Sequence, residues 1–142
     1  MATPKIETLI ERYQPTIVIV QLGTNWMDRS LSDNQIRAFL ERFVNAVHRG
    51  GTRRMIWIGP PDSSRFSKVQ NRIYRLIQQS VRRGDPVIDS RRFTRYLLGK
   101  TGGDGVHYNS ESGEAWARRV IASIDQVLAA DIAARRKLAS NR

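Results

Sequence analysis

The sequence predicts an α/β layer fold with a parallel sheet of about three strands and flanking helices. Segments with the apolar spacing of amphipathic helices alternate along the chain with short apolar or β-branched segments. The segment TIVIVQLG at 16–23 is a nearly continuous β-branched stretch, which is typical of a strand covered on both faces. Helices between buried strands favour right-handed crossovers within one parallel sheet.

The first helix and strand are predicted near the N-terminus. Thr3 is a candidate N-cap and Pro4 suits the first helical position. Apolar residues within 3–13 follow i, i+3, i+4, i+7 spacing, so one helix face is expected to be buried. Pro15 ends this helix, and the first strand follows at 16–23.

A second helix is expected from about Ser32 to His48, with the next strand close behind it. Ser32 and Gln35 have the spacing of a capping box, and the two glycines at 50–51 end the helix. The segment RMIWIGPP at 54–61 is predicted as the second strand, which its two prolines terminate.

The third helix, third strand and last helix complete the expected alternation. Ser67 and Gln70 repeat the capping-box spacing at the start of the third helix. PVIDS at 86–90 is a short third strand, and a long helix is expected from about Ser110. This last helix is expected to fray into a basic helical tail at about 130–142.

Composition limits the class of protein. The 142 residues fit one domain, 1–142, and contain no cysteine, which excludes disulfides and thiolate metal sites. No apolar segment approaches the length of a membrane span, and the N-terminal residues lack the apolar core of a secretory signal, so the compartment stays open. The net charge of +11 comes from dispersed arginines without a nucleic-acid-binding motif, so we do not expect a nucleic-acid partner.

Polar and glycine-rich segments follow each predicted strand. In parallel sheets ligands bind outside the carboxyl ends of the strands, so these loops are the candidate site. They are GTNWMD at 23–28, GPPDSSRF at 59–66, DSRRF at 89–93 and the segment TGGDGVHYN at 101–109.

Asp104 and His107 lie three residues apart in the last of these loops. A histidine can accept a proton from a hydroxyl nucleophile and return it to a leaving group, and a carboxylate on its other ring nitrogen fixes the tautomer. The alternative is a helix-entry loop in which Asp104 bonds backbone amides and His107 only packs.

Gly23 and Asn25 follow the first predicted strand. Glycine permits close backbone approach there, and the Asn25 amide could donate to a developing oxyanion. The alternative is an ordinary turn, in which asparagine is common.

Together, IVIVQLGTN, IWIGPP, VIDS and DGVHYNSESGEAWA resemble the later part of SGNH hydrolases, also called the GDSL esterase/lipase family. The resemblance covers about residues 3–128. It implies a three-layer flavodoxin-like fold and acyl-ester hydrolysis by a Ser-His-Asp triad. By position, His107 would be the base and then the acid, Asp104 its orienting carboxylate, and Asn25, in the block with Gly23, a donor to the oxyanion hole. The entry to the last helix, through Ser110, Gly113 and Trp116, also resembles the family.

Two features depart from the family pattern. Trp26 stands where an aspartate commonly follows the asparagine, although Asp28 could substitute for it. The Gly-Asp-Ser block that carries the nucleophile should lie upstream, yet only 22 residues precede Gly23. We therefore expect a truncated, partial SGNH domain that lacks the nucleophile segment and is inactive alone.

Other residues on these loops could contribute to a site. A replacement nucleophile among the serines of 63–64 and Ser90 would need His107 within hydrogen-bond reach. The arginines at 91, 92 and 95 either form a solvated cluster or select an anionic substrate such as an acidic glycan. The candidate substrate-lining residues are Trp26, Ser63, Ser64, Arg91 and Arg92.

No cofactor is expected. With two histidines, His48 and His107, and no clustered ligands, a metal site is not predicted. GKTGGDG lacks the residue order of a phosphate-binding loop. The expected partner is a small-molecule or glycan acyl ester, and an unpaired sheet edge predicts self-association. The alternative function is a non-catalytic module that binds a glycan or a partner chain in the same groove.

Overall fold

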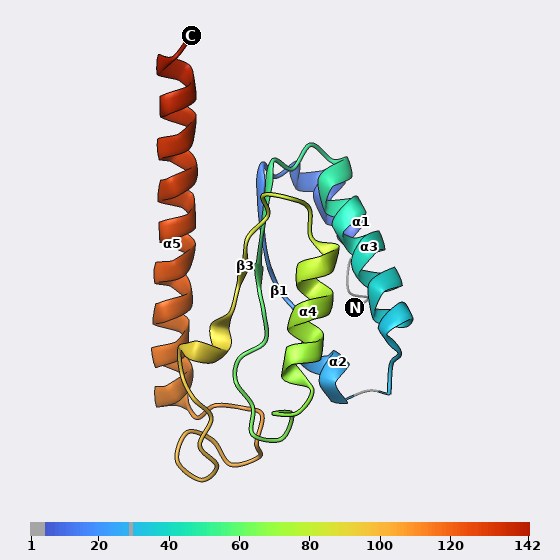
Figure 1. Ribbon diagram of the computed structural model, residues 1–142, viewed down its shortest axis with the longest axis vertical. Coiled ribbons are helices and arrows are strands. Elements are labelled where there is room, and N and C mark those ends of the chain that lie inside the picture. The colour runs from blue at the N-terminus through green and yellow to red at the C-terminus, as the bar shows by residue number, and fades with distance from the viewer. Residues whose placement is uncertain (1–4, 29) are drawn as a thin grey trace.

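The structure, a computed structural model, describes residues 5–28 and 30–142 as one sheet between two helical layers (Figure 1). The sheet has three parallel strands in the order β1-β2-β3, which confirms the predicted α/β fold. In chain order the elements are α1 (Ile6–Tyr13), β1 (Ile17–Gln21), α2 (Thr24–Asp28), α3 (Asp33–Arg49), β2 (Arg54–Ile58), α4 (Gln70–Ser80), β3 (Val87–Ile88), the 3₁₀ turn η1 (Ser90–Arg92) and α5 (Ser110–Ser140).

The strand register brings all the carboxyl ends to one edge of the sheet. Gln21 at the end of β1 pairs with Ile58 at the end of β2, and Ile58 pairs with Ile88 at the end of β3. The loops that leave these strands therefore start side by side. The sheet therefore holds the loops of the predicted site next to one another.

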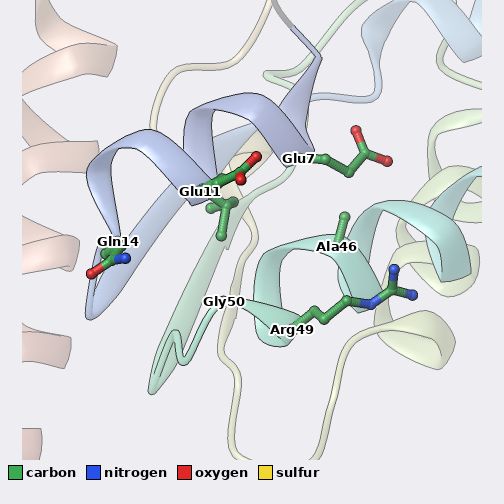
Figure 2. Close-up of a pocket in the computed structure, with 7 residues that line it drawn as sticks. Glu7, Glu11, Gln14, Ala46, Arg49 and Gly50 are labelled. Carbon is green, nitrogen blue, oxygen red and sulfur yellow. The ribbon is translucent and has the colours of Figure 1, made fainter.

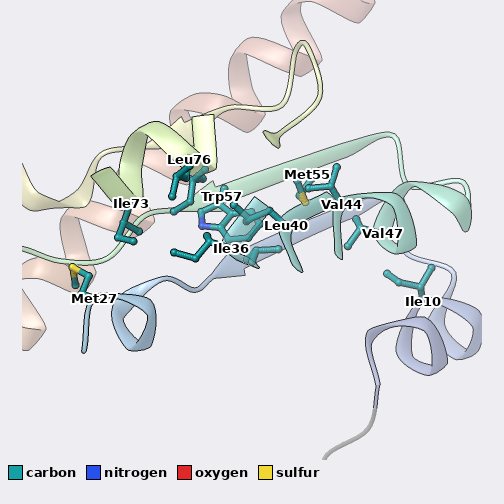
Figure 3. Close-up of a cluster of buried hydrophobic side chains, with 12 residues drawn as sticks. Ile10, Met27, Ile36, Leu40, Val44, Val47, Met55, Trp57, Ile73 and Leu76 are labelled. Carbon is teal, nitrogen blue, oxygen red and sulfur yellow. The ribbon is translucent and has the colours of Figure 1, made fainter. Parts of the chain in front are cut away.

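The larger core lies between the sheet and the layer of α1, α3 and α4 (Figures 1 and 3). Trp57 of β2 is fully buried at its centre and donates its indole N–H to the carbonyl of Leu22, 3.1 Å away. The apolar stripe of α3 covers this face with residues that are at most 3% exposed: Ile36, Leu40, Val44 and Val47.

Helix α5 covers the other face of the sheet (Figure 1). Val120 of α5 packs with Ile56, Ile58 and Ile88, and Ile17 of β1 joins this cluster at its margin. Side chains alternate along a strand, so Ile19 faces the same side as Ile17, yet it is 49% exposed. The expectation that the first strand is covered on both faces is therefore wrong, because one helix is too narrow to reach across β1.

The two predicted capping boxes have different outcomes. At α3 the prediction is confirmed: Ser32 N donates to Gln35 Oε1 at 2.9 Å, and Gln35 N donates to Ser32 Oγ at 3.2 Å. At α4 it is wrong, because the N-cap is Val69 and makes no side-chain cap bond. The amide of Gln70 instead donates to Asp62 Oδ1 at 3.2 Å and to the Ser63 carbonyl at 2.9 Å.

The observed ends of the first and last helices can be compared with the predicted ones. Lys5 is the N-cap of α1, and the expected start at Thr3 and Pro4 lies outside the described residues. Asn109 caps α5 by accepting from Ser112 N at 2.9 Å. Helix α5 continues to Ser140, so most of the basic segment at 130–142 is helical rather than frayed.

A buried contact between His48 and Asp85 joins the helical layer to the sheet at the amino ends of the strands. His48, at the end of α3, places Nε2 2.5 Å from Asp85 Oδ2 and Nδ1 3.1 Å from the Thr52 carbonyl. Asp85 Oδ1 also accepts from the backbone N–H of Met55 in β2. Neither of the two sequence segments gave a sign of this link.

Candidate functional site

The loop between Tyr96 and Asn109 brings Asp104 and His107 together. Asp104 Oδ2 lies 2.5 Å from Nδ1 of His107. The His107 side chain is 82% exposed, and no hydrogen bond in the described part of the chain involves its Nε2. One ring nitrogen is therefore oriented by a carboxylate while the other faces solvent, as proton transfer by this histidine would require.

Asp104 is also held by the backbone of its own loop. Its Oδ1 accepts the N–H groups of Val106 and His107, each at 2.8 Å. The bond from the His107 ring, followed by these two backbone bonds, lowers the pKa of Asp104 far below its usual value. Asp104 therefore bonds backbone amides, as one alternative expected, and also contacts the His107 ring; contrary to that alternative, the exposed His107 side chain does not pack.

Buried groups fix the position of this loop through Gly105. The Gly105 carbonyl accepts from Ser63 Oγ at 2.6 Å and from Arg65 N at 3.2 Å. Its N–H donates to the hydroxyl oxygen of Tyr96 at 3.0 Å, and that hydroxyl donates to the His107 carbonyl at 3.2 Å. Gly105 has φ +85°, which favours glycine, so the exposed pair stands on a rigid base.

Tyr96 is a site residue that sequence analysis missed. It is 4% exposed and stacks on Tyr108 with 5.5 Å between ring centroids. Its backbone N–H donates to Asp62 Oδ2 at 2.8 Å, which ties the loop after β2 to the loop of His107. It lies in an arginine-rich segment without apolar periodicity, so no sequence signal marked it.

The candidate serines lie in different environments. Ser90 is fully buried and donates to the Gly59 carbonyl at 2.7 Å. Ser63 is 2% exposed, and its bond to Gly105 gives it a structural role rather than an open, substrate-lining one. Ser64 is exposed, beside Gly105. In residues 5–28 and 30–142, no serine hydroxyl forms a hydrogen bond with His107.

Gly23 and Asn25 lie where β1 passes into α2. Gly23 has φ +137°, and a Cβ there would press on the ring of Pro60 at 3.1 Å, so glycine is needed for both reasons. The segment expected to be a loop is instead the short helix α2, with exposed Asn25 in its first turn. Asn25, Gly23 and Trp26 line a hollow of about 210 Å³. Asp28 bonds Arg65 at 3.4 Å, and the structure gives it no hydrogen bond to Asn25.

The arginines after β3 are not equivalent. Arg91 is half-buried and forms a bidentate pair with Asp89, with Nε–Oδ1 and Nη2–Oδ2 distances of 2.8 and 2.6 Å. The hydrogen bond from Arg91 holds the pKa of Asp89 below its usual value. Arg92 and Arg95 are exposed, and neither forms an ion pair with a residue of the described chain.

Other parts of the molecule hold fewer groups that could bind a ligand or take part in a reaction. A pocket of about 310 Å³ lies between α1 and α3, near the amino ends of the strands, with Glu7 and Glu11 opposite Arg49 (Figure 2). Within 5–28 and 30–142, no group of three or more histidine or acidic residues could hold a metal ion. None of the helices described has the length and apolar character needed to cross a bilayer.

Two solved structures share this fold. One is a carbohydrate esterase family 3 protein from Talaromyces cellulolyticus, with 22% identity and a TM-score of 0.64; the match covers 86% of this chain and 63% of that chain. The other is a mutant acetyl esterase with an acetate ion, with 21% identity and a TM-score of 0.67, covering 89% of this chain and 65% of that one.

The present chain spans less than two thirds of the length of either neighbour. Neither a protein-family model nor a curated protein sequence matches the chain. The arrangement of strands and helices in this chain is thus shared with two esterases of known structure. The roles of individual residues in it rest on the geometry above.

Proposed function

We propose that this chain supplies the acid–base part of an SGNH-type serine esterase that hydrolyses an acyl ester. One observation carries the proposal. Asp104 orients His107 through Nδ1 at 2.5 Å and leaves Nε2 open, at the sheet edge where ligands bind in α/β folds. The two structural neighbours are a carbohydrate esterase and an acetyl esterase, which supports an acylated carbohydrate as the substrate.

Each group in the proposed reaction has a defined role. Nε2 of His107 takes the proton of a serine hydroxyl as the serine oxygen bonds to the ester carbonyl carbon. The amide of Asn25 and the backbone beside Gly23 stabilise the negative charge that develops on the carbonyl oxygen. The bond to the alkoxy group then breaks, and His107 gives its proton to the leaving alcohol. A water molecule, which gives a proton to His107, then attacks the acyl carbon in the same way. The bond to the serine oxygen breaks, His107 returns the proton to the serine, and the carboxylic acid is released.

We infer that the serine is carried by a strand that pairs with β1. The open side of β1 is the support for this inference, because β1 pairs only with β2 in the described sheet and Ile19 is half-exposed beside it. A parallel strand there would end at the same edge as β1. Its last residues would reach the hollow of Asn25.

A probe of reactive serines tests where the nucleophile lies. The chain and its His107→Ala variant are incubated with a fluorophosphonate, and their intact masses are compared. We expect no adduct that depends on His107. A single adduct present only with His107 would place the nucleophile within this chain and contradict the inference of a separate strand.

The competence of His107 can be measured without that serine. A carboxylate-supported imidazole should hydrolyse p-nitrophenyl acetate, so we expect the His107→Ala rate to be lower by about tenfold or more. Arg82→Ala is the control, because Arg82 is exposed and lies beyond the last residue of α4, away from His107. Equal rates in the wild type and His107→Ala would contradict the acid–base role.

The second candidate function is a non-catalytic module that binds a glycan or a partner chain. It is favoured by the lack of a hydrogen bond between His107 and any serine hydroxyl in the described residues. The open edge of β1 also predicts self-association. We expect sedimentation to show dimers at high concentration and Ile19→Lys to reduce them; a concentration-independent monomer would contradict this.

A further inference from the structure

A second set of polar side chains lies at the carboxyl edge of the sheet, apart from Asp104 and His107. It lines a shallow depression of about 460 Å³ between the loop after β2, the first turn of α4 and the segment after β3. The lining residues that matter here are Asp62, Gln70, Asn71, Arg91, Arg92 and Arg95. Neither member of the His–Asp pair belongs to this depression.

Arg91 is held rigidly in its wall. Besides the bidentate pair with Asp89, its Nη1 donates to Asn71 Oδ1 at 2.6 Å. Its guanidinium lies 4.0 Å from the centroid of the Tyr74 ring, which gives a cation–π contact. These contacts use three of the guanidinium N–H groups and leave one on each Nη atom for a ligand.

Arg92 and Arg95 add free positive charge to the open side. Both are exposed and have no carboxylate partner in the described chain, although each lines the depression. Guanidinium groups bind planar carboxylates through paired N–H···O bonds. The three arginines therefore favour an anionic ligand over a neutral one.

Hydrogen-bond acceptors also line the depression. Gln70 is 4% exposed, and its Oε1 is buried without a partner in the described chain, while its amide nitrogen is held by Asp62 and Ser63. An unpaired buried amide oxygen is costly, so a turn of the Gln70 side chain that lets Oε1 accept from a ligand O–H group is favoured on binding. Asp62 is also an acceptor, and the two carboxylates of Asp62 and Asp89 would repel a dianion such as phosphate.

We propose that this depression binds a sugar acid, that is, a carboxylate with neighbouring hydroxyl groups, as in a uronate unit of a glycan. The carboxylate pairs with Arg92 and Arg95, and the hydroxyls donate to Asp62 and Gln70. This binding goes beyond the proposed esterase reaction and does not require His107 to be catalytic.

The test is a titration of the ¹⁵N-labelled chain, followed by NMR at constant ionic strength. D-glucuronate supplies the carboxylate and the hydroxyls, D-glucose the hydroxyls alone, acetate the carboxylate alone, and inorganic phosphate a competing anion. We expect glucuronate to bind about tenfold or more tightly than each of the others. Its shifts should include the Gln70 side-chain amide and the backbone of 91–95.

Two double variants test whether binding needs the arginines of the depression or only the net positive charge of the protein. Arg92→Ala/Arg95→Ala should weaken glucuronate binding about tenfold or more. Arg82→Ala/Arg83→Ala removes the same charge from exposed positions at the other end of α4 and should leave binding unchanged. Equal losses in the two variants, phosphate binding tighter than glucuronate, or no glucuronate shifts at 91–95 would each overturn the proposal.

Discussion

The protein has two His–Asp pairs with equally short contacts but different surroundings. His48 and Asp85 meet at 2.5 Å with side chains 6% and 5% exposed, and His107 and Asp104 meet at 2.5 Å with side chains 82% and 52% exposed. Both ring nitrogens of His48 face acceptors, whereas Nε2 of His107 has no protein partner among the described residues. The same two residue types thus make a buried cross-link in one place and, in the other, an exposed pair with one ring nitrogen open to solvent.

The largest expected effect is the difference in unfolding free energy between a variant of the buried pair and a variant of the exposed pair. His48→Ala leaves the buried Asp85 carboxylate without its partner and should lower the free energy of unfolding by about 3–5 kcal/mol. His107→Ala removes an exposed side chain and should change it by less than about 0.5 kcal/mol. Urea unfolding of both variants measures the difference. Similar losses would show that the exposed pair is also structural.

Tyr74 is another buried titratable group, and it extends the comparison to alkaline pH. Its hydroxyl donates to the Pro60 carbonyl and accepts from Ser90 N, and burial raises its pKa to about 12. The unfolded chain ionises near pH 10, so the stability tied to the neutral hydroxyl is present below pH 10 and is lost between pH 10 and 12.

Tyr74→Phe removes that titration. We expect the wild type to lose up to about 2 kcal/mol more than the variant between pH 9 and 12, from a shift of this size. Urea unfolding at several pH values gives the free energy of unfolding of each protein as a function of pH. Every other titratable group is the same in the two proteins, so the difference between the two curves comes from Tyr74. Parallel curves would mean that Tyr74 ionises in the folded state as readily as in the unfolded chain.

A smaller effect should follow from loosening the base of the exposed pair. Ser63→Ala loses the bond to the Gly105 carbonyl and should cost about 1–2 kcal/mol. Amide exchange at Gly105 and His107 should then become faster. Ser64→Ala, at the exposed neighbouring position, is the matched control and should match the wild type in stability and exchange. Faster exchange in both variants would mean that Ser63 is not the anchor.

The smallest effect concerns the Asp104 carboxyl itself. Its pKa is lowered first by the His107 ring, so His107→Ala should move it back towards 3.8 while the backbone bonds keep part of the lowering. A group with a lowered pKa stabilises the fold above about pH 4, and that contribution is lost as the pH falls through the folded value. Carboxyl ¹³C NMR titration measures both proteins; identical inflections would show that the pair does not persist in solution.

Local patterns predicted the fold well but not every local contact. Ser32 and Gln35 form the predicted capping box, whereas Ser67 and Gln70, with the same spacing, do not. The difference is tertiary, because the amide of Gln70 is taken by Asp62 and by the Ser63 carbonyl in another loop. A pattern of four residues carries no information about such a competitor.

The site was predictable only where its contacts are local in the sequence. Asp104 and His107 are three residues apart, so their pairing could be anticipated. The roles of Ser63 and Tyr96 depend on contacts with Gly105 that span 42 and 9 residues, respectively. The link between His48 and Asp85 spans 37 residues and has no signal in either segment.

Gly102 has a consequence for how this sequence can evolve. A side chain there would overlap the His107 carbonyl and the Tyr96 hydroxyl, and neither of these oxygens has a role in the proposed reaction. Backbone packing, and not chemistry, requires this glycine. A descendant that lost Asp104 and His107, but kept the loop, would therefore retain it. Across homologues, glycine at this position should mark inheritance of the fold, and the aspartate and histidine should mark inheritance of the reaction.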